Sequence, residues 1–175
     1  MIMEKDKFLA DREELRAIQK VFESSVENNA IEDIRSFVHP DFSFVSFTDK
    51  SFSSFDAFKS QWEITRKKMV GAGSFSSQLN PEPTLFIDDI AISHGNANNT
   101  LIDAKGCRYD FTNQWTVVFK RLDGDWKVLR AHNSLDPFNN PMLVSGVKQK
   151  IVKYSVLAFI GGAVLCSISS YMILG

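Results

Sequence analysis

Residues 114–134 read QWTVVFKRLDGDWKVLRAHNS, two apolar-rich runs joined by a tight turn. Asp123-Gly124 between two such runs is a strong turn signal and predicts an antiparallel β-hairpin. A second turn at residues 103–106 (DAKG) predicts that residues 90–102 form the strand before this hairpin. The second half of the chain is therefore expected to be a meander of strands, which also includes the shorter segments 75–79 and 84–87.

The first half of the chain has helical periodicity. Glu14 follows Asp11 at the spacing of a capping box, which predicts the start of a first helix. A short second helix is predicted over residues 30–38 and is ended by Pro40. A third is predicted because side chains that can share one helix face recur at spacings of three and four: Phe55, Phe58, Trp62, Thr65 and Met69. Helices followed by strands predict an α+β fold, a cone-shaped, curved antiparallel sheet packed on three N-terminal helices.

Three features of residues 11–136 point to a known family. They are the element order, the segment HPDF at 39–42 with the helix start SFDAF at 54–58, and the closing hairpin that ends in His132-Asn133-Ser134. Together they resemble the nuclear-transport-factor-2-like superfamily, in particular its SnoaL-like and ketosteroid-isomerase-like domains. The resemblance implies a cone that serves isomerases, cyclases, dehydratases, ligand-binding modules and structural dimers, so it fixes no single activity.

Several polar residues on the predicted strands are candidates for a pocket. With Trp126 placed inward, strict alternation points Arg130 and His132 into the cone. His132 could then act as a general acid or base, and Arg130 could bind a carboxylate. The structural alternative is an arginine paired with a local acid and a hydrogen-bonded histidine at the sheet end. The full set of candidate ligand-binding residues is Arg130, His132, Asn113, Tyr109, His94 and Trp62.

The candidates for catalysis are His132 and Tyr109. By the resemblance, Tyr109 could donate to a developing oxyanion, as a tyrosine does in ketosteroid isomerases. Those enzymes also need an aspartate base in the cone, and neither Asp41 nor Asp110 is a convincing match. No catalytic residue is therefore assigned. Because the sequence has no phosphate loop, nucleophile elbow or metal-ligand spacing, no cofactor and no metal are expected.

Residues 154–174 contain no charged side chain. As a helix this segment is about 31 Å long, which matches a bilayer core of about 30 Å. We therefore predict one C-terminal transmembrane helix, preceded by a linker at 137–153, the α+β domain at 11–136 and a tail at 1–10. Lysines lie only on the domain side of the segment, so the positive-inside rule places the domain in the cytoplasm. The alternative is a buried helix of a soluble domain.

Small residues recur at every fourth position of this apolar segment. Such a ridge lets another helix approach closely in the bilayer, and it consists of Ala158, Gly162, Cys166 and Ser170. It predicts packing against the helix of a partner subunit or a second copy of the chain. The 20 basic and 21 acidic residues nearly cancel, so no nucleic-acid partner is expected.

The sequence favours an accessory or assembly subunit of a membrane-protein complex. The superfamily resemblance implies that a homodimer would use the outer face of the sheet, which carries Thr112, Gln114, Thr116 and Val118. Two alternatives stay open. One is an enzyme that acts on a small lipophilic molecule by acid–base chemistry in the cone, and the other is a ligand-binding sensor with Arg130 as an anion clamp.

Overall fold

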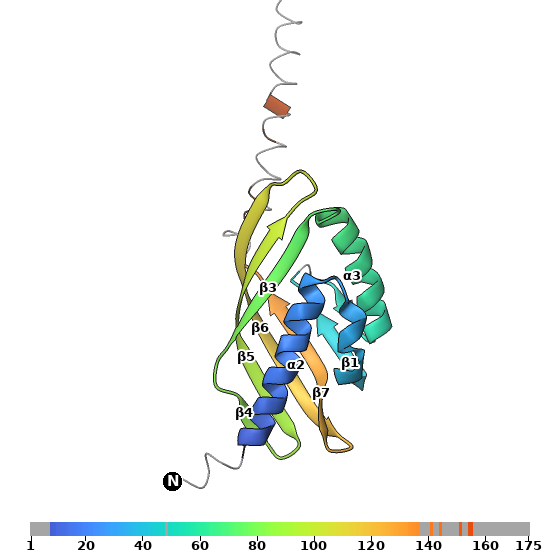
Figure 1. The fold of residues 1–175 in the computed structure, drawn as a ribbon, viewed down its shortest axis with the longest axis vertical. Helices are drawn as coiled ribbons and strands as arrows, with labels where there is room; N and C mark the ends of the chain where they lie inside the picture. Colours follow the sequence, from blue (N-terminus) through green and yellow to red (C-terminus); the bar gives the residue numbers. More distant parts are fainter. Residues whose placement is uncertain are drawn as a thin grey trace, which may run out of the picture. The chain divides into compact units, whose positions relative to one another are not determined.

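A computed structural model describes residues 8–47 and 49–136, with five positions beyond them (Pro141, Val144, Ile151, Tyr154 and Ser155). The first 136 residues contain three helices and a curved sheet of seven strands (Figure 1), which confirms the predicted α+β class. The elements are α2 (Leu9–Glu27), η1 (Ile31–Phe37), β1 (Val38–Val45), β2 (Ser51–Phe52), α3 (Phe55–Met69), β3 (Ser74–Pro81), β4 (Leu85–Ile87), β5 (Ile90–Ile102), β6 (Arg108–Leu122) and β7 (Asp125–Ser134).

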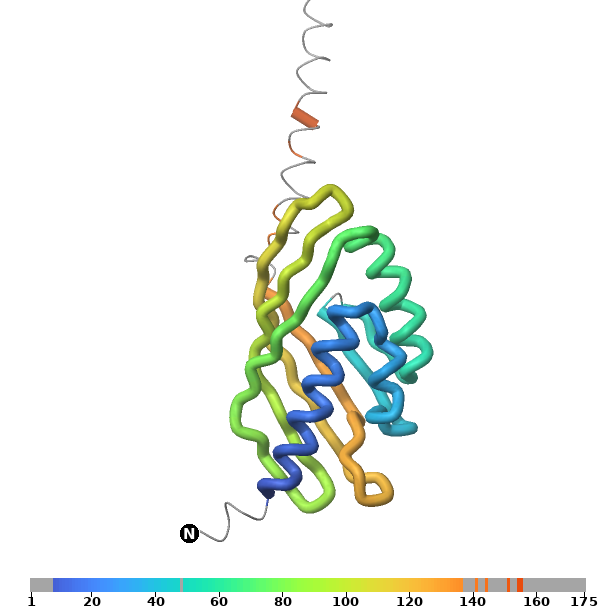
Figure 2. The backbone as a smooth tube through the Cα atoms, viewed as in Figure 1, coloured from blue at the N-terminus to red at the C-terminus, as the bar shows by residue number. Residues whose placement is uncertain are grey.

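The sheet has the strand order β2-β1-β7-β6-β5-β3, and β4 also pairs with β5. Figure 2 follows the long strands β3, β5 and β6 along the curve, with α2 and α3 on one side of the sheet. The expectation of a wholly antiparallel sheet is wrong at one pair, because β1 runs parallel to β7. The first strand of the chain thus pairs with the last, and this pair joins β1 and β2 to the β5–β7 meander.

The chain divides into two compact units, residues 1–136 and 137–175. Among the described residues, no helix is long and apolar enough to cross a membrane. The predicted transmembrane helix at 154–174 lies outside the described residues except for Tyr154 and Ser155. The small-residue ridge of Ala158, Gly162, Cys166 and Ser170 lies wholly outside them.

Helix α2 is fixed to the β6–β7 hairpin by the two acids that resembled a capping box. The helix begins at Leu9, and its N-cap Phe8 makes no side-chain cap, so the capping prediction is wrong. Glu14 instead accepts a hydrogen bond from the Trp126 backbone N–H at 2.8 Å. Asp11 accepts one from the Trp126 indole at 3.3 Å and forms an ion pair with Arg121. These acids therefore fasten the helix to the sheet.

Phenylalanines dominate the packing between β1, β2 and α3. Phe44 and Phe58 meet edge to face with ring centroids 5.0 Å apart, and Phe58 also contacts Phe42 and Phe52 at 6.3 and 6.1 Å. Such aromatic pairs stabilise by about 0.5–1.5 kcal/mol beyond the area they bury. The high Phe content of the sequence is thus used to hold α3 against the first two strands.

Gly95 in β5 allows β3 to cross closely over the strand. A Cβ at this position would lie 2.2 Å from the carbonyl oxygen of Asn80, a distance that real Cβ atoms do not adopt. Gly95 also lies directly opposite Trp115 of β6, whose indole donates to the Asn96 carbonyl at 2.9 Å. The glycine therefore marks a close backbone approach in this strand.

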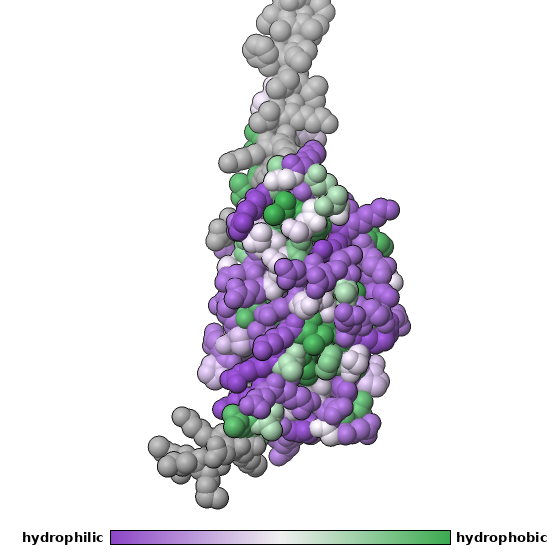
Figure 3. Space-filling view, in the orientation of Figure 1, coloured by the Kyte–Doolittle hydropathy of each residue, from purple (hydrophilic) through white to green (hydrophobic). Residues whose placement is uncertain are grey.

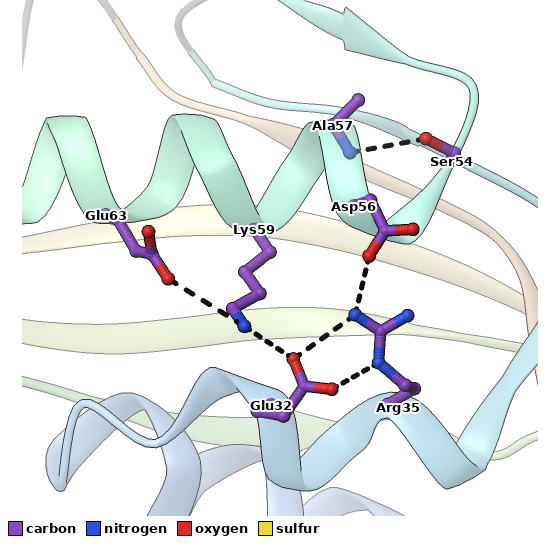
Figure 4. Close-up of polar contacts among 7 residues, drawn as sticks. All are labelled: Glu32, Arg35, Ser54, Asp56, Ala57, Lys59 and Glu63. Atoms are coloured by element: carbon purple, nitrogen blue, oxygen red, sulfur yellow. Dashed lines mark hydrogen bonds and ion pairs between the residues drawn. The ribbon is translucent and has the colours of Figure 1, made fainter.

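A surface network of charges joins η1 to α3 (Figure 4). Arg35 pairs with Glu32 and reaches Asp56 at 2.6 Å, while Lys59 reaches Glu32 at 2.8 Å. The hydrogen bonds from Arg35 and then Lys59 lower the pKa of Glu32 from 4.5 to about 2. Arg35 also lies over the Phe55 ring at 4.6 Å, so the network lies directly on the aromatic packing of α3.

The Glu32 network predicts an acid-dependent loss of stability. A carboxylate whose pKa falls on folding stabilises the folded state above its unfolded pKa, and this contribution disappears as pH falls through its folded pKa. The window for Glu32 is therefore pH 4.5 down to about 2. We expect Glu32→Gln to reduce the decline of the urea midpoint between pH 5 and pH 2.5. Glu63→Gln, which removes only a 4.0 Å pair with Lys59, is the control. Equal pH dependence in Glu32→Gln and the wild type would contradict this prediction.

Candidate functional site

The interior of the cone is a cavity of about 560 Å³. Helix α2 forms one wall and α3 another, and the concave face of the sheet forms the rest. From the helix side, apolar side chains show in the middle of a mostly hydrophilic face (Figure 3). The volume lies within the range typical of small-molecule sites, which are mostly apolar with a few polar groups.

Aromatic side chains form much of the cavity wall. Trp62 of α3 packs on Phe75 of β3 with ring centroids 6.1 Å apart, and Phe75 stacks on Phe111 of β6 at 6.4 Å. Phe47, in the turn after β1, joins the same group with its ring centroid 6.4 Å from that of Phe111. Trp115 lines the cavity as well. A ligand would therefore meet flat apolar surfaces on several sides.

Three asparagines of adjacent strands give this wall a polar patch. Asn99 of β5, Asn113 of β6 and Asn133 of β7 all line the cavity. The Asn99 amide donates to Asn113 Oδ1 at 2.7 Å and to the carbonyls of Ala97 and Phe111 at 3.2 and 3.3 Å. The Asn113 amide donates to its neighbour's carbonyl at 3.1 Å. The two residues are only 5% and 7% exposed, so the patch is part of the interior.

Charged side chains touch the cavity at few places. Among its described lining residues, the charged ones are Arg12 and Arg16 of α2 and Glu82 after β3. Glu82 is exposed and lies 3.1 Å from the exposed His94 ring. No group of three or more potential metal ligands occurs among the described residues. The part of the cavity next to the asparagines is thus lined by neutral groups.

A β-bulge at Leu129 reverses the expected direction of the last strand's side chains. Val118 pairs with Arg130 but Phe119 pairs with Val128, so Leu129 is the extra residue. A bulge of one residue moves the following side chains to the other face. The prediction that Arg130 and His132 point into the cone is therefore wrong, and both are exposed. Arg130 donates to backbone carbonyls of Asp41 and Leu129.

The candidate His94 of β5 does not face the cavity. Its side chain is exposed, while the buried residues of this strand include Ala91, Ser93, Gly95, Ala97 and Asn99. Ser93, Ala97 and Asn99 line the cavity, and at Gly95 the backbone of β3 lies too close for a side chain. On β6 the candidate Asn113 is buried in the cavity wall, whereas the candidate Tyr109 is half-buried and does not line the cavity.

The sequence interpretation therefore placed two candidates on the cavity wall, Trp62 and Asn113. It missed Asn99 and Asn133. Asn99 could have been found from the tight alternation of small and larger residues along β5. Asn133 could not be found by alternation alone, because the bulge at Leu129 lies four residues before it and shifts the pattern.

Comparison with known proteins agrees with this architecture. The sequence model of the calcium/calmodulin dependent protein kinase II association domain matches residues 11–137. The chain belongs to this association-domain family. An NTF2-like protein with a cystatin-like fold from Novosphingobium aromaticivorans is similar at 16% identity and a TM-score of 0.66, over 77% of this chain and 87% of that one.

Two further solved structures show how widely this fold is used. A nuclear transport factor 2 superfamily protein from Salmonella enterica aligns at 13% identity and a TM-score of 0.62, over 70% of this chain and 89% of its own. A hexachlorocyclohexane dehydrochlorinase from Novosphingobium barchaimii aligns at 14% and 0.63, over 73% and 88%. No curated protein matches the chain. At these identities the likeness shows the fold and leaves the activity open.

Because of the bulge, we expect an aspartate to reduce stability at one position of β7 and to have little effect at the next. Ala131 lines the cavity and His132 is exposed. We expect Ala131→Asp to lower the free energy of unfolding by at least about 2 kcal/mol, because a carboxylate would lose water at an apolar wall. His132→Asp should stay within about 0.5 kcal/mol. Urea unfolding followed by tryptophan fluorescence measures both, and equal losses would place the two positions in equivalent surroundings.

Proposed function

We propose that this chain is a non-catalytic association module, an accessory or assembly subunit that works at a membrane. Its domain joins a second copy of the chain or another subunit through the outer face of the sheet. The C-terminal segment 154–174 holds it in the bilayer, with the domain on the cytoplasmic side. Family membership supports association, and the charge-free segment with lysines on one flank supports the tether.

One observation carries the proposal: a broad polar face of β5, β6 and β7 that bears little charge. Its exposed residues lie in register, with His94 and His132 on either side of Thr116, and Asn98 beside Thr112. The helices pack on the other side of the sheet (Figure 1). Uncharged side chains at the centre let two copies approach without like-charge repulsion, and depletion of charge is typical of interface centres.

Charged residues lie around the uncharged centre of this face. The exposed Arg108–Asp110 pair, 2.8 Å apart, lies near one end of β6, and Arg130 lies next to the histidine row on β7. Rim charges of this kind set orientation and association rate more than affinity. An uncharged centre with charged residues around it therefore suits a specific contact between sheets.

Acid–base catalysis on a lipophilic molecule has less support. Such chemistry needs a proton donor or acceptor within hydrogen-bond reach of a bound substrate. Among the described residues that line the cavity, the one carboxylic acid is the exposed Glu82, and no histidine or tyrosine is present. The candidates His132 and Tyr109 lie off the cavity wall. Binding of an anion in the cavity by Arg130 would require its side chain to point inward, whereas it is exposed on the outer face.

The association surface can be tested at its centre. Thr116 is exposed in the middle strand of the face, so Thr116→Arg would bring like charges together in a two-fold contact between sheets. Because such contacts cost several kcal/mol, we expect at least a tenfold weaker self-association by analytical ultracentrifugation of the detergent-solubilised chain. Ser60→Arg, exposed on α3, is the matched control. Unchanged association of Thr116→Arg would exclude this face.

A second test concerns the membrane segment and depends on sequence alone. A leucine at Gly162 would hold two helix backbones apart and remove close packing, the main attraction between helices in lipid. We expect Gly162→Leu to leave the chain in the membrane fraction but to reduce the recovery of its partners from mild detergent at least fivefold. Leu165→Ala, off the small-residue ridge, should change little. If Gly162→Leu retains every partner, the segment serves only as a tether.

A further inference from the structure

We propose that the cavity binds a neutral amphipathic molecule, with an apolar body and a single uncharged hydrogen-bonding head such as a hydroxyl or carbonyl. The head would meet Asn113 and Asn133, and the body would lie among the aromatic side chains. This inference concerns the inner face of the sheet. It is independent of the association surface proposed for the outer face.

The asparagine patch is arranged to receive both a donor and an acceptor. The Asn99 amide group is fixed by its three acceptors, which leaves Asn99 Oδ1 without a hydrogen bond from any described residue. Among the described residues, every fully buried side-chain nitrogen or oxygen has a hydrogen-bond partner. Asn99 Oδ1 has none, so it is not fully buried and faces the open cavity space. The Asn133 side chain makes no hydrogen bond with the described residues and lines the same space. Strand register makes Asn113 and Asn133 diagonal neighbours. A hydroxyl could accept from the second N–H of the Asn113 amide and donate to Asn133 Oδ1.

The uncharged, buried surroundings of the asparagines disfavour a ligand with a charged head. Asn99 and Asn113 are more than nine-tenths buried, and the nearby wall is formed by the rings of Phe47, Trp62 and Phe75. An ion there would lose its water without gaining a countercharge, which costs far more than burying a hydroxyl that keeps its hydrogen bonds. The lining arginines belong to the N-terminal half of α2, away from the asparagine patch.

The cavity volume limits the size of the apolar part of the ligand. Its volume of about 560 Å³ exceeds what one or two ordered waters need and suits an organic molecule. Trp62 and Trp115 both line it, so their fluorescence should report occupancy. Trp126 is 1% exposed and does not line the cavity, so it provides a constant background.

The test compares three eight-carbon probes that differ only in their heads: 1-octanol, octanoate and octylammonium. The full chain in lipid nanodiscs is titrated at pH 7 with each probe, tryptophan fluorescence is recorded, and nanodiscs without protein serve as the blank. We expect 1-octanol to bind at least tenfold more tightly than either ion. Tighter binding of octanoate would place the head at Arg12 and Arg16 and overturn the proposal, as would no response to any probe.

Two substitutions locate the head. Asn113→Leu and Asn133→Leu keep side-chain size but remove hydrogen bonding, so each should weaken 1-octanol binding about 3- to 10-fold. Gln78→Leu likewise replaces an amide, on the exposed side of β3 and off the cavity wall, and should leave binding unchanged. Asn133 loses no internal hydrogen bond, so it decides the question if Asn113→Leu fails to fold. Unchanged binding in Asn133→Leu would show that apolar fit alone holds the probe and would overturn the asparagine assignment.

Discussion

Strand β7 contains one residue more than β6 requires at Leu129, and the chemistry of both sheet faces depends on this bulge. Before it, Trp126 and Val128 face inward. After it, Ala131 and Asn133 take the inner face, and Arg130 and His132 take the outer one. Unbroken alternation would have put a guanidinium and an imidazole inside the cone. The bulge therefore keeps these two groups out of the cavity and places His132 on the outer face.

Much of the fold was predictable because local signals and the final structure agree. The predicted bounds of β5 and β7 match the observed ones, since the flanking turns at 103–106 and Asp123-Gly124 determine where these strands end. Helix α3 was found from its apolar spacing, and Ser54 caps it by accepting from the Ala57 N–H. Turns and long periodic runs need only neighbouring residues, so sequence alone suffices for them.

The failures have a common cause, because each depends on residues far apart in the chain. Asp11 and Glu14 have capping-box spacing, but their partners, Arg121 and Trp126, are more than 100 positions away. Pro40 ends the second helix as predicted but then lies inside β1, at a register irregularity between Val38 and Ser43. Proline is tolerated in strands at such irregularities. Strand direction at Asn133 failed for the same reason, since the bulge is set by pairing.

The open cavity is maintained by polar contacts at the edges of α2. Glu14 holds the helix to the β7 backbone near its start, and Gln19 and Glu23 bind the Leu79 carbonyl and N–H of β3 at 3.0 and 2.7 Å. At its end, Arg66 of α3 donates to the Val26 carbonyl at 2.9 Å. Protein interiors otherwise pack closely, and an apolar void costs stability in proportion to its volume. Collapse of α2 onto the sheet would break these hydrogen bonds at three places and leave their polar groups without partners. The helix therefore stays away from the sheet, and the space remains available to a ligand.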